Sequence, residues 1–492
     1  MFSIDIHKLI DQLLYQPEAP LIFNSGIFLF LLTGFLLIYI PLSKTHRPKL
    51  FFVTLFSLYF YYKSSGLFFL LLLSTVVIDY HLAAAIGKTL FKSKKQILLA
   101  LSIIANLGLL IYFKYTNFLV ELISPVAGIE YKPLDIFLPV GISFFTFQSM
   151  SYTIDVYRGH LKPVSHILDY AFFVSFFPQL VAGPIVRAAD FLPQLNLPTF
   201  VTREMFGRGI FLIVTGLFKK AIISDYISLN FVDRVFDAPT LYSGLENLFG
   251  VYGYALQIYC DFSGYSDMAI GIALLLGFHF NLNFDSPYQS KNITEFWRRW
   301  HMSLSSWLRD YLYISLGGNR KGKFRTYINL LLTMLLGGLW HGAALRFVLW
   351  GALHGLALGV HRAFNSVFPF RPGSHSWLWN GMTTFLTFHF VCFCWIFFRV
   401  SSLETAGQVI SQISTQLNPQ LLLPFIKGYP MVVVLMVIGY LLHFLPTSME
   451  NWASRLVIRM PFLAKASLLT VVIFLVIQTK SATIQPFIYF QF

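Results

Sequence analysis

The sequence predicts an all-α, polytopic membrane protein, and three observations support this prediction: the composition, the apolar runs along the chain and the placement of its charges. Hydrophobic residues make up 56% of the 492 positions, charged residues only 12%, and phenylalanine alone occupies 53. Soluble domains are about 45–50% apolar. Because the sequence contains no long polar stretch that could form a soluble domain, we expect a single membrane domain over residues 1–492.

A series of apolar runs predicts the membrane helices. Several runs are shorter than the roughly 20 residues that cross hydrocarbon as a helix, so some are expected to be tilted, re-entrant or covered by protein. We predict about 11–13 transmembrane or re-entrant helices. The absence of an evident internal repeat disfavours a transporter built from inverted repeats. The runs lie near residues 21–42, 50–62, 66–85, 96–113, 136–156, 168–183, 206–223, 245–278, 325–341, 343–361, 381–399, 429–446 and 464–479.

The formal net charge of +14 comes largely from cations in short loops between these runs. Lys44, Arg47 and Lys49 lie between the first two runs, and a second group of lysines follows the third. Cytoplasmic loops of membrane proteins are rich in Lys and Arg, so we expect both loops in the cytoplasm and the amino terminus outside. Contact with anionic lipid headgroups accounts for much of the remaining charge, and no nucleic-acid partner is expected.

The amino end and the cysteines give little further information about fold or function. Residues 1–20 lack the basic, apolar and small-residue pattern of a cleaved secretory signal. Cys260, Cys392 and Cys394 are odd in number and form no C-x-x-C pair, so they predict neither a disulfide framework nor a zinc site. We expect all three to be packing residues and predict no metal site.

The polar stretch at residues 285–325 predicts one interfacial helix that does not cross the bilayer. Asn292 is a plausible N-cap with Glu295 three residues later, and Gly317 and Gly318 form a stop signal. The apolar positions between these ends draw a single stripe at helical spacing. They are Ile293, Phe296, Trp297, Trp300, Leu304, Trp307, Leu308 and Tyr311.

His301 falls at the edge of this stripe, with Arg298 one turn before it and Ser305 one turn after it. Its ring is therefore expected at the boundary between an apolar wall and a polar cavity. Aromatic residues at this spacing are more often packing than chemistry, and Arg298, Arg299 and Arg309 could anchor to headgroups. The residues alone support a functional and a structural role for His301 equally.

His341 lies in the apolar stretch 335–344, where an ionisable side chain is costly and therefore indicates function. Gly337, Gly338 and Gly342 remove bulk on both sides of it, so that another helix or a substrate can approach closely. A neutral imidazole there could act as a general base; the alternative is a core histidine that a carbonyl satisfies. A packing role is favoured for His354, His361, His389 and His443.

Several motifs of rare residues follow one another in order. They are Phe-Asp-Ser-Pro-Tyr at 284–288, the run Glu-Phe-Trp-Arg-Arg-Trp-His-Met-Ser-Leu-Ser that continues to Tyr313 from residue 295, and Gly-Gly-Leu-Trp-His-Gly at 337–342. Together they resemble the membrane-bound O-acyltransferase (MBOAT) family. Stretches 176–185 and 257–267 and the aromatic ending 486–492 are similar to its bacterial branch, which contains the alginate O-acetyltransferase membrane subunit and the teichoic acid D-alanyl transferase. The active-site core falls at about 280–361.

The resemblance implies a helical ring around a central tunnel, where a cytoplasmic acyl donor meets an acceptor hydroxyl. The family's principal catalytic histidine falls on His341, and the second active-site position falls on His301. His341 would be the general base, and His301 would polarise the thioester or orient the acyl group. Further substrate-binding or supporting candidates are Trp297, Arg298, Arg299, Trp300, Ser305, Asp310 and Trp340.

The resemblance also implies partners. Acetyl-CoA would be the donor substrate, with no bound cofactor, and Arg298, Arg299, Arg320 and Lys321 could hold the phosphates of coenzyme A or of a carrier's phosphopantetheine arm. In the polysaccharide-acetylating subfamily a separate secreted or periplasmic hydrolase-like acetyltransferase completes the transfer. This sequence has no Gly-x-Ser-x-Gly elbow, so that partner would be another chain.

Three functions remain to be weighed. Chain length favours an O-acetyltransferase of polysaccharide. Such an enzyme would lie in the bacterial cytoplasmic membrane and serve exopolysaccharide biosynthesis of the alginate-like kind, with the acceptor polymer left open. The alternative within the branch is D-alanyl transfer from an acyl carrier protein to teichoic acid. An alternative from a different class is a proton-coupled transporter in which His301 and His341 form a proton relay.

Overall fold

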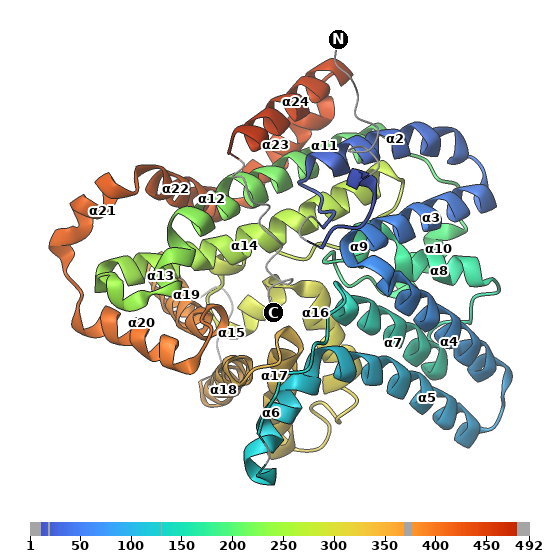
Figure 1. Ribbon diagram of the computed structural model, residues 1–492, viewed down its shortest axis with the longest axis horizontal. Helices are drawn as coiled ribbons and strands as arrows, with labels where there is room; N and C mark the ends of the chain where they lie inside the picture. Colours follow the sequence, from blue (N-terminus) through green and yellow to red (C-terminus); the bar gives the residue numbers. More distant parts are fainter. Residues whose placement is uncertain (1–10, 18–19, 129, 369–375, 480–492) are drawn as a thin grey trace. The chain divides into compact units, whose positions relative to one another are not determined.

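The computed structural model describes residues 11–17, 20–128, 130–368 and 376–479, and every regular element within these ranges is a helix (Figure 1). The aromatic ending at 486–492 lies outside them. Four described helical segments are long and apolar enough to cross a membrane, or five if one pair bent by 101° counts as a single span. The prediction of an all-α, polytopic membrane protein is confirmed. The spans are His46–Lys88, Lys92–Ala127, Leu345–Val367 and Trp377–Arg399, and the bent pair is Pro419–Gly428 with Pro430–Phe444.

The chain forms two compact units. Unit 1 consists of Met1–Gly209 and Met268–Asn281, and unit 2 of Ile210–Asp267 and Leu282–Phe492. The helices of unit 1 are α2 (Gly26–Leu42), α3 (His46–Ser65), η1 (Gly66–Phe68), α4 (Phe69–Lys88), α5 (Lys92–Leu110), η2 (Ile111–Tyr115), α6 (Thr116–Ala127), α7 (Ile142–Arg158), α8 (Ile167–Ser175), α9 (Phe177–Leu180) and α10 (Ala188–Leu195).

A buried carboxylate joins three helices of unit 1. Asp79 of α4 is fully buried and accepts hydrogen bonds from Ser102 Oγ (2.6 Å) and Asn106 Nδ2 (2.7 Å) of α5. Ser102 Oγ also lies 2.9 Å from Thr153 Oγ1 of α7. These three helices lie side by side (Figure 1). Because a buried carboxylate is tolerated where it is hydrogen-bonded, this cluster fixes how α4, α5 and α7 pack.

Unit 2 carries the predicted site motifs. Its elements are α11 (Arg203–Leu217), η3 (Phe218–Ser224), α12 (Asp225–Ile227), η4 (Ser228–Val232), α13 (Asp233–Asp237), η5 (Pro239–Leu241), α14 (Gly244–Leu275), η6 (Pro287–Gln289), α15 (Ile293–Arg299), α16 (Met302–Trp307), η7 (Leu308–Tyr313), α17 (Lys323–His341), α18 (Leu345–Val367), α19 (Trp377–Arg399), α20 (Leu403–Thr415), η8 (Pro419–Leu421), α21 (Leu422–Gly428), α22 (Pro430–Phe444), α23 (Thr447–Arg459) and α24 (Phe462–Thr479). The start of α11 and the end of α14 belong to unit 1.

The predicted apolar runs all overlap helices in the two units. Cys260, Cys392 and Cys394 are buried free thiols, as the sequence predicts. The orientation of the chain in the membrane stays a prediction.

Two glycines bring α17 and α18 of unit 2 into backbone contact. A Cβ atom on Gly338 of α17 would lie 2.2 Å from the Phe347 carbonyl oxygen, and one on Gly351 of α18 would lie 2.3 Å from the Met334 carbonyl oxygen. Small residues allow such close approach between membrane helices. His341, the last residue of α17, is therefore held directly beside α18.

Ion pairs, one of them buried, join the π-helical turn η3 to α14. The Lys220 side chain is 3% exposed and contacts Asp225 (2.7 Å) and Asp261 (2.5 Å), and the neighbouring Lys219 contacts Asp267 at 2.7 Å. π-helical turns widen a helix locally and often occur near functional sites. Here the turn directs two consecutive lysines toward carboxylates of α14.

Replacing Lys220 by methionine is expected to destabilise the protein by about 3–5 kcal/mol, because it removes the ammonium that the buried Asp261 and the partly buried Asp225 contact. Thermal unfolding in detergent would measure the loss. The matched change at an exposed pair, Arg309→Met beside Asp310, is expected to alter stability by no more than about 1 kcal/mol. Equal unfolding temperatures for the two variants would contradict a structural role for the buried pair.

Candidate active site

The prediction of one unbroken interfacial helix is wrong, since the backbone breaks at His301. α15 ends at Arg299, Trp300 is extended, and His301 adopts a left-handed conformation (φ 42°, ψ 54°) before α16 begins. The cause is a long-range contact: Met302 N–H donates to the Asn283 carbonyl oxygen (2.8 Å) instead of continuing α15. A left-handed residue other than glycine costs about 1–3 kcal/mol and persists where its surroundings hold it, often at functional sites.

The other features predicted for this stretch are confirmed. Asn292 caps α15, because its side chain accepts a hydrogen bond from Glu295 N at 2.9 Å. The Glu295 carboxylate accepts from Lys291 N rather than from the cap residue itself. Gly317 and Gly318 have positive φ angles and end the helical stretch. The apolar stripe is buried throughout, at Ile293, Phe296, Trp297, Trp300, Leu304, Trp307, Leu308 and Tyr311.

His341 ends α17 in an aromatic enclosure. It is 2% exposed, and its ring centroid lies 5.0 Å from Trp340, 5.1 Å from Trp350 and 5.2 Å from Phe398. A Cβ atom on the next residue, Gly342, would lie 1.9 Å from the Phe347 ring. The glycines around His341 therefore make room for α18. The sequence predicts close approach of either another helix or a substrate, and here it is a helix.

The fold brings the two histidines together, although forty residues separate them. Their ring centroids are 6.5 Å apart with an interplanar angle of 56°. Trp340 contacts both rings, and Phe262 of α14 packs edge-on against His301 at 4.6 Å. Two imidazoles can share one oxygen through two hydrogen bonds of about 2.8 Å, and the rings then lie farther apart than in a direct nitrogen-to-nitrogen hydrogen bond. The distance of 6.5 Å between the ring centroids fits such a shared oxygen.

His301 is fully buried, and its Nδ1 lies 3.2 Å from Asn283 Oδ1. Burial among aromatic rings lowers the pKa of this imidazole below its usual value. The ring is therefore neutral at pH 7, with one N–H donor and one acceptor nitrogen.

The tryptophan candidates Trp297 and Trp300 are buried among aromatic rings. Trp297 Nε1 donates to His354 Nδ1 at 3.2 Å, and Trp300 stacks on Phe296. Ser305 and Asp310 lie in local contacts: Ser305 Oγ donates to the Trp300 carbonyl oxygen at 3.1 Å, and Asp310 pairs with the exposed Arg309 at 2.6 Å. Trp340 is thus the supporting candidate that touches both histidines.

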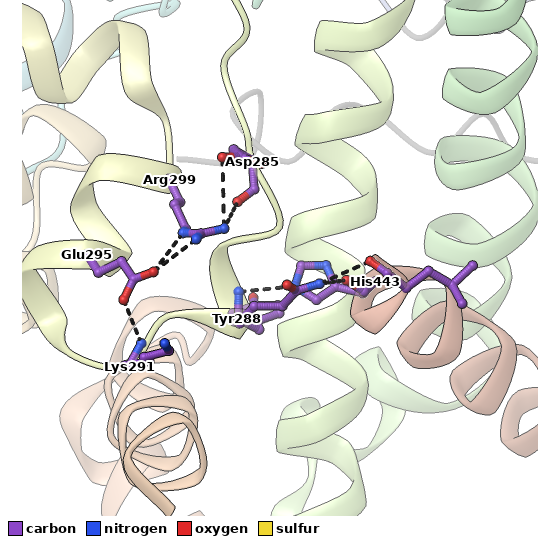
Figure 2. Close-up of polar contacts among 8 residues, drawn as sticks. Asp285, Tyr288, Lys291, Glu295, Arg299 and His443 are labelled. Atoms are coloured by element: carbon purple, nitrogen blue, oxygen red, sulfur yellow. Dashed lines mark hydrogen bonds and ion pairs between the residues drawn. The ribbon is translucent and has the colours of Figure 1, made fainter. Parts of the chain in front are cut away.

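The candidate cations differ in their surroundings. Arg298, Arg320 and Lys321 are exposed, whereas Arg299 is half-buried between two acidic residues. Figure 2 shows the Arg299 guanidinium reaching Glu295 Oε1 (2.9 Å), the Asp285 carbonyl oxygen (3.2 Å) and the Asp285 carboxylate (3.8 Å). Arg299 therefore ties the segment before α15 to that helix.

The histidines assigned to packing do make structural hydrogen bonds. Figure 2 shows the Tyr288 amide donating to His443 Nε2, at 3.0 Å. His389 Nε2 lies 2.9 Å from the Tyr252 hydroxyl, and His361 Nδ1 lies 2.8 Å from Thr294 Oγ1.

Sequence reasoning missed Asn283 and Ser266. Asn283 is 1% exposed, contacts His301 and donates through Nδ2 to Ser266 Oγ of α14 at 3.1 Å. Asn283 directly precedes the Phe-Asp-Ser-Pro-Tyr motif, and Ser266 lies inside the stretch 257–267. Both positions therefore adjoin recognised motifs, but only the folded backbone connects them to His301.

Comparison with known proteins places the sequence in a family. Residues 65–401 match MBOAT, the membrane-bound O-acyltransferase family. This match covers more than half of the chain, so the protein belongs to that family and is a membrane O-acyltransferase.

Similar proteins come from the bacterial branch that the motifs resemble. The chain is 39% identical over 425 residues to the peptidoglycan O-acetyltransferase of Helicobacter pylori, covering 79% of each chain. It is 42% identical over 395 residues to a probable alginate O-acetylase of Pseudomonas aeruginosa, covering 79% of this chain and 74% of the relative. Identity to the teichoic acid D-alanyltransferase of Bacillus subtilis is 32% over 278 residues, covering 54% and 69%.

Proposed function

We propose that this enzyme uses acetyl-CoA from the cytoplasm for the O-acetylation of an extracytoplasmic polysaccharide, with His341 and His301 at the reacting hydroxyl. The observation that carries the proposal is the pair of buried imidazoles 6.5 Å apart. The relatives named as O-acetyltransferases of peptidoglycan and alginate, which match most of this chain, favour acetyl as the transferred group.

His341 is the general base in this proposal. Its imidazole takes the proton of the acceptor hydroxyl while that oxygen attacks the thioester carbonyl. The carbon–sulfur bond then breaks, and the imidazolium returns the proton to the leaving thiolate, so that coenzyme A departs as the free thiol. The position of His341 at the carboxyl end of α17 suits this role, because the negative end of a helix dipole stabilises a cation.

The exposed cations and a second protein complete the proposal. Arg298, Arg320 and Lys321 would bind the donor's phosphates, since guanidinium and ammonium groups form strong charge-assisted bonds to phosphate oxygens. The enzyme would lie in the bacterial cytoplasmic membrane and pass acetyl groups to a secreted or periplasmic hydrolase-like acetyltransferase, which would complete the transfer to the polymer.

Acetyl turnover by the purified protein tests the donor. With radiolabelled acetyl-CoA in lipid nanodiscs, we expect release of free coenzyme A and labelling of an added polysaccharide or partner protein. Turnover of a D-alanyl-loaded carrier protein instead would identify the D-alanyl alternative, which the Bacillus subtilis relative represents. Proton uptake into proteoliposomes with no acyl turnover would identify a transporter. If the acetyl proposal is correct, a strain that lacks this gene should lose the acetyl groups of its polymer and keep its D-alanyl esters.

A further inference from the structure

Asn283 holds the turn at His301 through both its backbone and its side chain. Its carbonyl oxygen accepts from Met302 N at 2.8 Å. Its side-chain Oδ1 accepts from Ser303 N (3.2 Å) and Ser303 Oγ (2.9 Å), and the same oxygen lies 3.2 Å from His301 Nδ1. Nδ2 donates to Ser266 Oγ on α14. A buried asparagine thus supports His301, a strained residue of the candidate active site.

These contacts fix which way the Asn283 amide faces. The Ser303 backbone N–H can only donate, so the atom that it meets must be an acceptor, and an amide turned over would place its NH₂ group there. The oxygen is therefore the atom that faces His301. Because an amide oxygen only accepts, His301 Nδ1 must carry the proton of the contact.

The Ser303 hydroxyl does not compete for Nδ1. It lies 3.4 Å from His301 Nδ1 but 2.9 Å from Asn283 Oδ1, and its single proton follows the shorter contact. Nδ1 is thus the donor and Oδ1 the acceptor.

We propose that Asn283 is a positioning residue that fixes His301 as its Nδ1–H tautomer, so that Nε2 is the hydrogen-bond acceptor of this ring. The inference rests on the proposed function, which places both histidines at the reacting hydroxyl. A neutral ring in this tautomer has no proton on Nε2 to donate to a thioester carbonyl. His301 therefore acts on the hydroxyl side of the reaction, where Nε2 accepts a hydrogen bond from the acceptor, rather than polarising the thioester.

The groups packed against His301 set its charge. α14 presents Phe262 and Ser266, and the carboxylates next to them in sequence, Asp261 and Asp267, are bound to Lys220 and Lys219. From the other elements, the facing groups are Phe284, Trp340 and the titratable ring of His341. A carboxylate within hydrogen-bond distance of Nδ1 would add a negative charge beside this ring.

Asn283→Asp supplies that charge and keeps the acceptor oxygen. Opposite charge within hydrogen-bond distance favours the imidazolium and raises a histidine pKa by about 1–3 units. We therefore expect His301 to take up its proton at a pH about one unit or more higher than in the wild type, read from the pH dependence of its ¹⁵N signals. The matched control is Asn292→Asp, which also replaces an asparagine oxygen that accepts a backbone N–H but caps α15, and its His301 titration is expected to coincide with that of the wild type.

Asn283→Ala removes the contact altogether. We expect kcat to fall about 10²-fold because the ring loses its orientation, with KM for acetyl-CoA within about twofold of wild type. A purely structural role would instead lower the amount of folded protein and leave kcat per folded molecule unchanged, which size-exclusion chromatography with active-site titration separates.

The tautomer can also be read without a variant at Asn283. In ¹⁵N-histidine-labelled protein in bilayers, the His301 signal, assigned by its loss in His301→Ala, is expected to show a protonated Nδ1 and an unprotonated Nε2. A protonated Nε2, or an unmoved His301 titration in folded Asn283→Asp, would overturn the inference. Absence of acyl turnover in the wild type would instead refute the proposed function, and the NMR result would still decide the tautomer.

Discussion

The His341→Ala enzyme is expected to transfer acetyl groups about 10²–10⁴-fold more slowly than the wild type, because the hydroxyl loses its general base. The loss should appear in kcat, measured as coenzyme A release from acetyl-CoA. KM for acetyl-CoA should change little, since His341 is enclosed by Trp340, Trp350 and Phe398 and is not one of the exposed cations proposed for the donor's phosphates.

Two further variants separate chemistry from packing. His341→Gln retains most of the side-chain volume inside the aromatic enclosure and is expected to lose activity to a similar extent while unfolding at the wild-type temperature. His389→Ala removes a half-buried histidine that contacts Tyr252 and Phe385 and is expected to keep full activity. Acetyl transfer at the wild-type rate by His341→Ala or His341→Gln would exclude His341 as the base.

Gly338→Ala is expected to impair stability and activity together. Its new Cβ atom would meet the Phe347 carbonyl oxygen at 2.2 Å, so α17 and α18 must separate. Overpacking of this kind costs about 1–3 kcal/mol. Because His341 lies less than one turn further along α17, we also expect kcat to fall by about 10-fold or more. Thermal unfolding and coenzyme A release measure the two effects.

Gly359→Ala is the control for this change. Gly359 lies on α18, and a Cβ atom there meets nothing closer than Tyr327 at 3.5 Å, an ordinary packing distance. This variant should be at least as stable as the wild type, because alanine favours a helix over glycine by about 1 kcal/mol. If Gly338→Ala behaved like Gly359→Ala, the close approach of α17 and α18 would not matter for the site.

The sequence predicts the helices well because their signals are local. Burial of the stripe from Ile293 to Tyr311, the cap at Asn292 and the stop at Gly317 all follow from spacing and residue type. The break at His301 depends on a hydrogen bond from Met302 to the Asn283 backbone, which no local pattern in the helix predicts. The apolar residues from Ile293 to Tyr311 therefore keep helical spacing, although the backbone between them is broken at His301.

The pairing of the two histidines could be predicted only through the resemblance to a family. Composition and spacing identify His341 as costly and His301 as a boundary residue, but they do not place the rings 6.5 Å apart. Arg299 shows the opposite limit: as a cation in a motif it resembles a phosphate ligand, whereas in the fold it pairs with Glu295 and Asp285. A sequence shows that a residue is a cation, but it does not show which groups that cation contacts in the fold.

The buried Asp79 links the stability of α4 in the membrane to helices that are synthesised after it. Ribosomes build the chain from its amino end, so this carboxylate emerges within α4 before Ser102 and Asn106 of α5, and well before Thr153 of α7. An ionisable group in lipid without donors is costly, which makes α4 alone a poor candidate for release into the bilayer. Asp79 therefore makes the stability of α4 in the bilayer depend on the later helices that supply its hydrogen-bond donors.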